Sequence, residues 1–218
     1  MSLFASLLRD FRRTASDLPG LFSGHFCVMF LPLAPLLGDE ATLPGYYSDQ
    51  TYFCRLRETH TDPLAPYRCK KQLKAGRCII LELDGLGSFV FTNHYHSALF
   101  QNLQRRFPGV TSYVFCSDGP GGYFKILKDG RIQRKVASYM FFEGMGSYAE
   151  TRGAPCAYEL ETGHIFKVDP KARHLREMMP DFTKREVLDL FDYYVGLDRF
   201  QSEALRRTLV YDLESPNT

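Results

Sequence analysis

The sequence predicts an α+β fold, with a mostly antiparallel β-sheet, helices packed on it, and helical N- and C-terminal segments. An aromatic share of 14%, from 18 Phe and 13 Tyr without Trp, favours a pleated sheet surface. Short apolar runs separated by Asp-Gly and Gly-rich turns occupy the middle of the chain, and patterns of helical period occupy its ends. These observations together favour one domain rather than several.

The N-terminal part predicts a helix followed by strands. Residues 1–20 place an apolar stripe on one side of a helix, formed by Phe4, Leu7, Leu8 and Phe11. After the Leu18-Pro19-Gly20 stop, the expected order is strand, loop, strand and short helix, over 25–31, 35–50, 51–58 and 62–77.

The middle of the chain predicts two hairpins around one helix. The turn 84–87 (DGLG) separates two strand-like runs and is a hairpin signal. A helix is expected over 93–109, because Asn93 can cap it and Pro108-Gly109 ends it. A strand, a hairpin, a further strand and a long connection follow at 110–117, 117–136, 138–144 and 143–157.

The C-terminal part predicts helices over 181–212. Thr183 and Glu186 have capping-box spacing ahead of an apolar stripe, and a second helix is expected from Asp198 onward. We therefore expect a single α+β domain over residues 1–218, divided into an N-terminal helix, a sheet-containing core and C-terminal helices at 1–20, 25–165 and 181–212.

The register of the hairpin at 117–136 can be predicted from its side chains. A three-residue loop with Gly130 in the left-handed conformation pairs Ile126 with Ile132. This register separates an apolar face from a polar face, which are Phe124, Ile126, Ile132 and Val136 against Lys125, Arg131, Gln133 and Lys135. Arg134 falls on the apolar face, so we expect it near a sheet margin or paired with a carboxylate.

Charge and cysteine usage limit the classes of function. The net charge of +2 creates no bulk field that would attract nucleic acid or an anionic membrane. The six cysteines form no C-x-x-C pair, which is typical of small buried side chains in a reducing compartment. The apolar run after residue 20 is interrupted by Gly24, His25, Pro32 and Pro35, so we expect neither a membrane helix nor a signal peptide, and a cytoplasmic location.

The sequence contains no catalytic or cofactor signature. The glycines at 119–122 lead into an alternating, strand-like segment, whereas a phosphate-binding loop opens a helix. His94 and His96 would point apart in a helical turn, which disfavours a metal site. The G-x-S-x-G and H-E-x-x-H patterns are both absent. We expect no catalytic residue, no cofactor and no metal.

One part of the sequence resembles a known group of proteins. Residues 107–159 combine a "DG.(hydrophobic).R" hairpin with a loop of the form "(E).G.P...E", matched by Asp129, Gly130, Ile132, Arg134, Gly153, Pro155 and Glu159. This pattern resembles bacterial immunity-type proteins encoded beside secreted toxins, including those of type VI secretion and polymorphic toxin systems. The resemblance implies a scaffold without shared catalytic residues.

An immunity protein needs a stable fold and a surface complementary to its toxin, so the resemblance implies a non-catalytic protein-binding module. The partner would be a cognate toxin or effector, encoded by an adjacent gene and neutralised by direct complex formation. Aromatic and charged side chains are typical of such surfaces. The partner-binding candidates are Tyr123, Lys125, Arg131, Gln133, Glu143, Tyr148, Glu150 and Arg152.

Two other classes of function stay open at this point. One is a small enzyme with a Cys- and His-containing pocket, using a residue such as His94 or Cys116. The other is a nucleic-acid accessory protein that uses the basic segment 68–77, although a charge run on a short helix is usually a solvated face. A homo-oligomer is also compatible with the sequence, because a hairpin edge can pair with a second copy.

Overall fold

The computed structural model describes the sheet and the helices that lie on it. The described residues are 25–33, 40–44, 51–60, 77–93, 98–118, 121–140, 147–167, 184–197, 200 and 205–214. The predicted helices at 1–20 and within 62–77 lie outside these residues, apart from Arg77.

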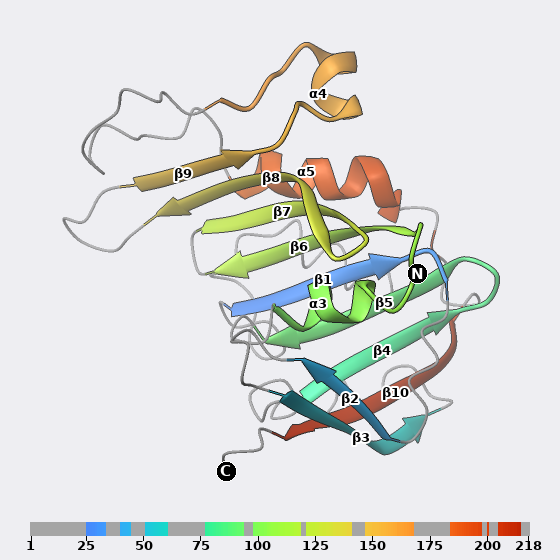
Figure 1. The fold of residues 1–218 in the computed structure, drawn as a ribbon. Coiled ribbons are helices and arrows are strands. Elements are labelled where there is room, and N and C mark those ends of the chain that lie inside the picture. Colours follow the sequence, from blue (N-terminus) through green and yellow to red (C-terminus); the bar gives the residue numbers. More distant parts are fainter. Residues whose placement is uncertain are drawn as a thin grey trace.

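The described part of the chain forms one twisted sheet of ten strands, in the order β2-β3-β10-β4-β5-β1-β6-β7-β8-β9 (Figure 1). Every neighbouring pair is antiparallel. The strands are β1 His25–Leu31, β2 Glu40–Pro44, β3 Thr51–His60, β4 Arg77–Leu83, β5 Gly87–Asn93, β6 Thr111–Asp118, β7 Gly121–Lys128, β8 Arg131–Met140, β9 Ser147–Arg152 and β10 Leu205–Glu214.

Three short helices accompany the sheet in the described part of the chain: α3 Ala98–Gln104, α4 Ala157–Thr162 and α5 Lys184–Val195. The longest of the three, α5, packs on β6, β7 and β8, while α3 contacts β2 and β7. The side chains of α5 and α3 belong to two different apolar clusters. The central strands are therefore buried on both faces, which explains why β1 and β4 are continuous apolar runs.

The predicted fold class, α+β with helices packed on the sheet and helical ends, is wrong. The structure is mostly antiparallel sheet, and the segment predicted as the last helix is strand β10, between β3 and β4. In β10, Leu209, Tyr211 and Leu213 alternate onto one buried face. The backbone N–H and C=O groups of β10 pair with β3 on one side and with β4 on the other. This tertiary pairing outweighs the local helical pattern.

Two predicted loops are also wrong. Strand β2 lies within the loop expected over 35–50, and strand β9 within the connection expected over 143–157. Both are edge strands of the sheet, and each pairs with one described neighbour. Short edge strands with Pro or Gly in them or beside them have a weak strand pattern in the sequence, because the neighbouring strand supplies most of their stability.

The register of the β7–β8 hairpin differs from the prediction. Its loop has two residues, Asp129 and Gly130, with φ of 52° and 68°. Leu127 pairs with Ile132, and the extra residue is accommodated as a bulge before Arg134 rather than in the turn. Ile132 therefore packs on the face opposite to Phe124 and Val136, contrary to the expected single apolar face.

The helix α3 explains why the two-residue loop is preferred. The backbone N–H of Gly130 donates to the Gln104 side chain at the end of α3, and the Asp129 carboxylate accepts from the Gly109 N–H at 2.7 Å. A Cβ at Gly130 would lie 2.1 Å from the Arg105 side chain, in a backbone conformation that already favours glycine. The turn is thus held by contacts with a segment about 20 residues earlier.

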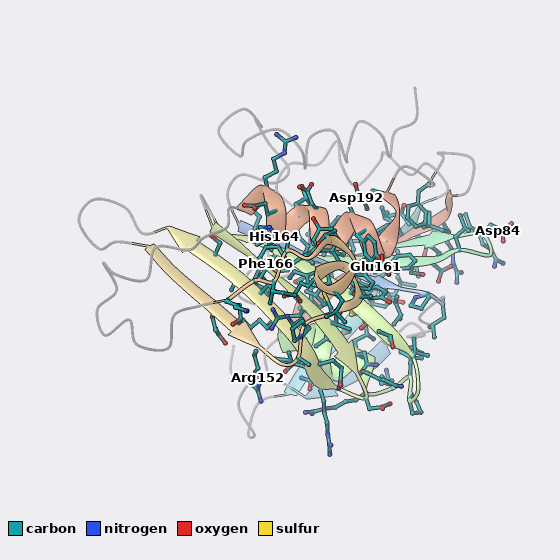
Figure 2. All side chains as sticks on the ribbon, turned by 90° about the horizontal axis from the view of Figure 1, so that it is seen from above. Asp84, Arg152, Glu161, His164, Phe166 and Asp192 are labelled. Atoms are coloured by element: carbon teal, nitrogen blue, oxygen red, sulfur yellow. A yellow bond between two sulfur atoms is a disulfide. The ribbon has the colours of Figure 1, made fainter. Side chains whose placement is uncertain are left out.

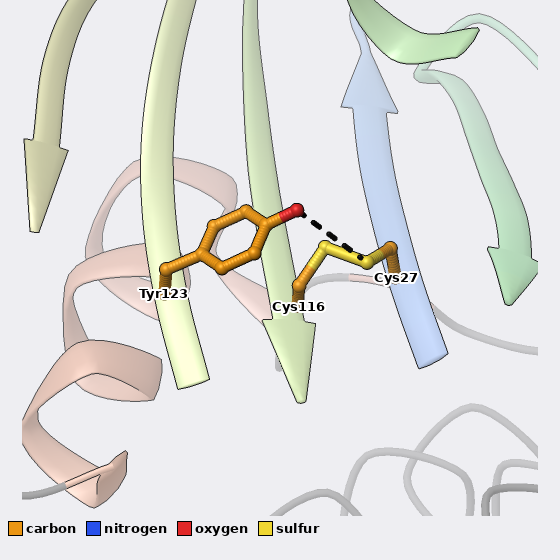
Figure 3. The surroundings of a disulfide bond; sticks show 3 residues. All are labelled: Cys27, Cys116 and Tyr123. Carbon is orange, nitrogen blue, oxygen red and sulfur yellow. Dashed lines mark hydrogen bonds between the residues drawn. A yellow bond between two sulfur atoms is a disulfide. The ribbon is translucent and has the colours of Figure 1, made fainter. Parts of the chain in front are cut away.

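A disulfide joins Cys27 of β1 to Cys116 of β6 in the middle of the sheet (Figure 3). The two residues are directly opposite each other, with Cα atoms 4.0 Å apart, and both are fully buried. The Tyr123 hydroxyl lies 3.7 Å from Cys27 Sγ. The expectation of unbonded cysteines is wrong for this pair, because only the strand order brings them together; Cys54, Cys78 and Cys156 are free and buried.

Reduction of this disulfide is expected to lower the free energy of unfolding by about 2–5 kcal/mol, because the bond restricts the unfolded chain between positions 89 residues apart. Urea denaturation with and without dithiothreitol measures the difference. In Cys116→Ala the reductant should have no effect on stability. Equal stability of the oxidised and reduced wild-type protein would contradict this prediction.

Candidate partner-binding surface

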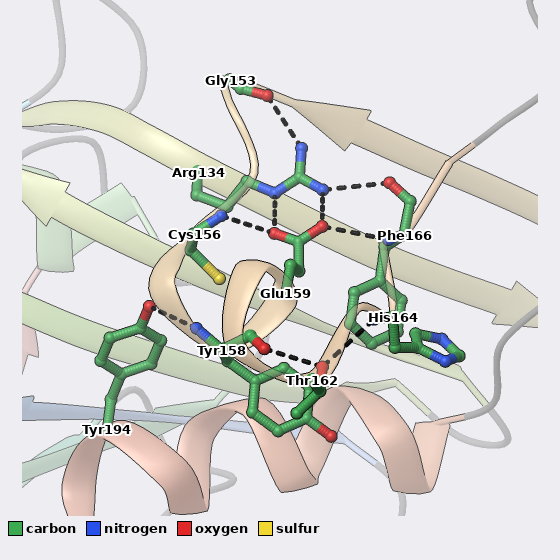
Figure 4. Close-up of polar contacts among 9 residues, drawn as sticks. All are labelled: Arg134, Gly153, Cys156, Tyr158, Glu159, Thr162, His164, Phe166 and Tyr194. Carbon is green, nitrogen blue, oxygen red and sulfur yellow. Dashed lines mark hydrogen bonds and ion pairs between the residues drawn. The ribbon is translucent and has the colours of Figure 1, made fainter.

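A buried ion pair between Arg134 of β8 and Glu159 of α4 supports the β9 end of the sheet (Figure 4). The Arg134 Nε donates to Glu159 Oε2 at 2.8 Å, and its Nη2 donates to Oε1, so the contact is bidentate. The remaining guanidinium donors reach the carbonyl oxygens of Gly153 and Phe166, at 2.8 and 3.0 Å. Arg134 is therefore paired with a carboxylate, as its position in the sequence predicts.

Glu159 accepts two further hydrogen bonds, from the backbone N–H groups of Cys156 and Phe166 at 2.8 and 3.0 Å. Cys156 is the residue that caps α4, and Glu159 lies at its third position, as in a capping box. Gly153 approaches β8 so closely that a Cβ there would lie 1.9 Å from the Gln133 carbonyl oxygen. The pair thus fastens the whole segment 153–166 to the sheet.

These contacts explain the motif on which the resemblance rests. Asp129 and Gly130 build the turn, Arg134 and Glu159 form the ion pair, and Gly153 permits the close approach. Each of these residues has a structural role within the described part of the chain. The motif therefore identifies a scaffold and names no reactive group.

Burial by itself would raise the pKa of Glu159, but the hydrogen bonds from Arg134 and Cys156 outweigh it and lower the pKa below its ordinary value of 4.5. A lowered pKa in the folded state means that the charged pair contributes stability above the unfolded-state pKa. That contribution is lost as the pH falls through the folded-state pKa.

Glu159→Gln is expected to lower the free energy of unfolding at pH 7 by about 3–5 kcal/mol, because it leaves the Arg134 charge buried without a counter-charge. Below the folded-state pKa the difference from wild type should shrink, because Glu159 itself becomes protonated. Denaturation curves between pH 3 and 7 measure both effects.

Glu161→Gln is the matched control, since Glu161 is exposed on the same helix, and it should change stability by less than about 0.5 kcal/mol. If Glu159→Gln does not fold, the double variant Arg134→Met/Glu159→Leu tests the same point. Its stability should recover toward that of wild type, because no buried charge is left unpaired. A difference between Glu159→Gln and wild type that stays constant with pH would contradict the assignment.

Four of the predicted partner-binding residues lie on one face at the β9 end of the sheet. Lys125 of β7 is opposite Lys135 of β8, which is opposite Arg152 of β9. Tyr123 and Glu150 occupy the neighbouring row, on either side of Ala137. Arg152 extends from the sheet on the side away from α5 (Figure 2). We call Lys125, Lys135 and Arg152, together with Glu150 from the neighbouring row, the charged row.

The charged row continues an apolar interior rather than forming an isolated surface. Across the strands toward the centre of the sheet, Lys125 is opposite Val114 of β6. In the neighbouring row, Tyr123 is opposite Cys116, which is opposite Cys27. These three partners are buried. The sheet is therefore apolar at its centre and charged where it approaches β9.

Individual contacts fix the geometry of the charged row. The Lys125 ammonium lies over the Tyr123 ring, 4.3 Å from its centroid, and the Lys135 ammonium lies 5.9 Å from the same centroid. Lys135 forms an ion pair with Glu150, and its side chain is only 16% exposed. Burial lowers the pKa of Lys125 to about 8, with the charge of Lys135 lowering it further and that of Glu150 raising it.

The other predicted partner-binding residues are not part of this cluster. Tyr123 is only 3% exposed, so its ring supports Lys125 and offers little surface to a partner. Arg131 and Gln133 are exposed near the end of the hairpin. Glu143 lies outside the described residues, as does the side chain of Tyr148. The prediction did not include Lys135 among the partner-binding residues, because its place opposite Lys125 depends on the bulge in β8.

The residues that carried the alternative functions have structural partners or are not described. Cys116 is bonded to Cys27, so it is not a free nucleophile. Arg77, the one described residue of the basic segment 68–77, is ion-paired with Asp212 at 2.9 Å. His94 and His96 lie outside the described residues. Within the described ranges, no group of three or more His, Cys, Asp or Glu side chains could hold a metal ion.

No family model, curated protein or solved structure matches this chain significantly. The described part of the chain also has no helix that is long and apolar enough to cross a membrane. The charged row is therefore interpreted from its own geometry and chemistry.

Proposed function

We propose that this chain is a non-catalytic protein-binding module of the immunity type, which neutralises a cognate secreted bacterial toxin by forming a direct complex with it. The charged row is the observation that carries the proposal. Three cations and one carboxylate are gathered on one face of the sheet, beside an edge strand that the Arg134–Glu159 pair supports. A fixed charged surface on a rigid scaffold suits the recognition of one protein partner.

The sign of the charged row indicates the chemistry of the partner. Lys125, Lys135 and Arg152 outweigh Glu150, so the contacting surface of the toxin would carry carboxylates. Arg152 is exposed, and such exposed charges act mainly on the rate of association and on its salt dependence. The toxin is expected to be the product of an adjacent gene.

Co-expression with the tagged product of an adjacent gene is expected to yield a stoichiometric complex and to restore growth in the presence of that toxin. Arg152→Glu should lower the association rate at low salt by about tenfold or more, because it reverses a charge at the contact. Arg206→Glu is the matched control, since Arg206 is exposed on β10, near the other edge of the sheet.

The outcomes test the immunity function and the location of the interface separately. Failure to obtain either a complex or growth rescue would contradict the immunity function. A complex whose association rate is equally sensitive to both substitutions would contradict the assignment of the charged row as the interface.

We also propose that the chain works in the cytoplasm, where an immunity protein would meet a toxin that has entered the cell. Cytoplasmic thiols are kept reduced, whereas disulfides persist in oxidising compartments. The proposal therefore requires that Cys27 and Cys116 are thiols inside the cell and form their bond only after leaving it, so the two residues report on the compartment. Rapid acid quenching of cells followed by thiol alkylation should show both residues as free thiols, and a Cys27–Cys116 bond in the quenched sample would contradict the cytoplasmic location.

A further inference from the structure

Lys125 is a partly buried cation that shares one described carboxylate, Glu150, with Lys135. Val114 and Lys135 lie opposite it on the two neighbouring strands, and its ammonium rests over the Tyr123 ring. The Glu150 carboxylate acts on Lys125 through its charge, while its ion pair is made with Lys135. Burying a charge in this way is unfavourable unless a counter-charge arrives, so the position favours binding of an anion.

The surrounding charges indicate how much negative charge would balance the site. Lys125, Lys135 and Arg152 contribute three positive charges along one row, and Glu150 contributes one negative charge through its ion pair with Lys135. The balance is two positive charges. A phosphate monoester carries about −1.5 to −2 charges at neutral pH, which matches this balance better than a single carboxylate does.

We propose that Lys125 and Lys135 form a binding site for one phosphate group, carried either by a free phosphate compound or by a phosphorylated residue of a protein. Lysine binds phosphate as a point charge, whereas a planar carboxylate is matched best by the fork of an arginine. Two ammonium groups on adjacent strands can each donate to a different oxygen of one tetrahedral group. Arg152, at the end of the row, adds positive charge where the site opens to solvent.

Contacts within the protein hold the side chains of the site in place. Tyr123 is buried, its hydroxyl contacts Cys27 Sγ, and its ring holds the Lys125 ammonium above it. The ion pair with Glu150 restrains Lys135. Holding both cations in place reduces the ordering cost of binding.

Proton linkage supports the same site. The groups that face Lys125 are Tyr123 on its own strand, Lys135 on β8, and Glu150 and Arg152 on β9, while β6 contributes the apolar Val114. Burial, followed by the charge of Lys135, lowers the pKa of Lys125 to about 8. A bound anion favours the charged form, so binding takes up a proton when the free protein has lost it.

Isothermal titration of the full chain with inorganic phosphate, at constant ionic strength and pH 7, tests the proposal. Wild type is expected to bind one phosphate, and Lys125→Met and Lys135→Met should each weaken binding by about tenfold or more, since each removes one charge-assisted contact. Lys128→Met is the matched control, because Lys128 is exposed on the same strand and should leave affinity unchanged. Thermal melting of each variant confirms that it is folded.

Sulfate serves as the probe for proton linkage, because its charge does not change between pH 7 and 9. A lysine with a pKa of about 8 is about nine-tenths charged at pH 7 and one-tenth charged at pH 9, so sulfate should bind about tenfold more weakly at pH 9. This pH dependence should disappear in Lys125→Met. Absence of phosphate binding by wild type, or an equal loss in Lys128→Met, would overturn the proposal.

Two further titrations distinguish the sources of the phosphate group. A phosphoserine peptide that binds tighter than inorganic phosphate, and loses its affinity when dephosphorylated, would indicate a phosphorylated protein; equal affinity would indicate a free phosphate compound. The site shares the charged row with the proposed function but does not rest on it. Phosphate binding is measured on the chain alone, so its failure leaves the toxin complex to be tested separately, and the reverse also holds.

Discussion

The buried pair of Arg134 and Glu159 is the interaction on which the β9 end of this structure depends. The pair joins a strand to a helix 25 residues later, and both side chains also hydrogen-bond to backbone groups of the segment 153–166. Because both groups are buried, neither can lose its partner without leaving a charge in the interior. The pair therefore makes the segment 153–166 and the hairpin one unit.

Helix α5 reinforces this unit from the same side. Tyr194 stacks between Tyr113 of β6 and Phe124 of β7, with ring centroids 4.8 and 5.8 Å away. The Tyr194 hydroxyl also accepts from the backbone N–H of Tyr158 in α4. One face of β7 and β8 is thereby closed by apolar and paired groups, and the charged row is confined to the other face. The chemistry proposed for that row depends on this division.

The same division explains why the resemblance to immunity-type proteins describes a scaffold. Asp129, Gly130, Arg134, Gly153 and Glu159 are all used in turns, close approaches or the ion pair. Lys125 and Lys135, which we propose to bind a phosphate group, belong to the other face and are not part of the motif. Substitutions in the charged row are therefore expected to leave the contacts of the motif intact.

Local chemistry in the sequence was sufficient to predict several features. The two apolar strands β4 and β5 around an Asp-Gly turn, the apolar stripe of α5 and the need of Arg134 for a carboxylate all follow from neighbouring residues or from the cost of burying a charge. The assignment of Lys125, Glu150 and Arg152 as partner-binding residues stays a prediction, and of these three only Arg152 is exposed.

Long-range pairing decided the rest. Strand β10 is a strand because it lies between β3 and β4, and the two-residue turn at Asp129 is selected by its contacts with α3 and the residues after it. The strand order β1-β6 brings Cys27 to Cys116, and the order β7-β8-β9 aligns Lys125, Lys135 and Arg152. Residue spacing along a chain does not specify which strands become neighbours, since that choice depends on the backbone hydrogen bonds and buried surface of the whole sheet.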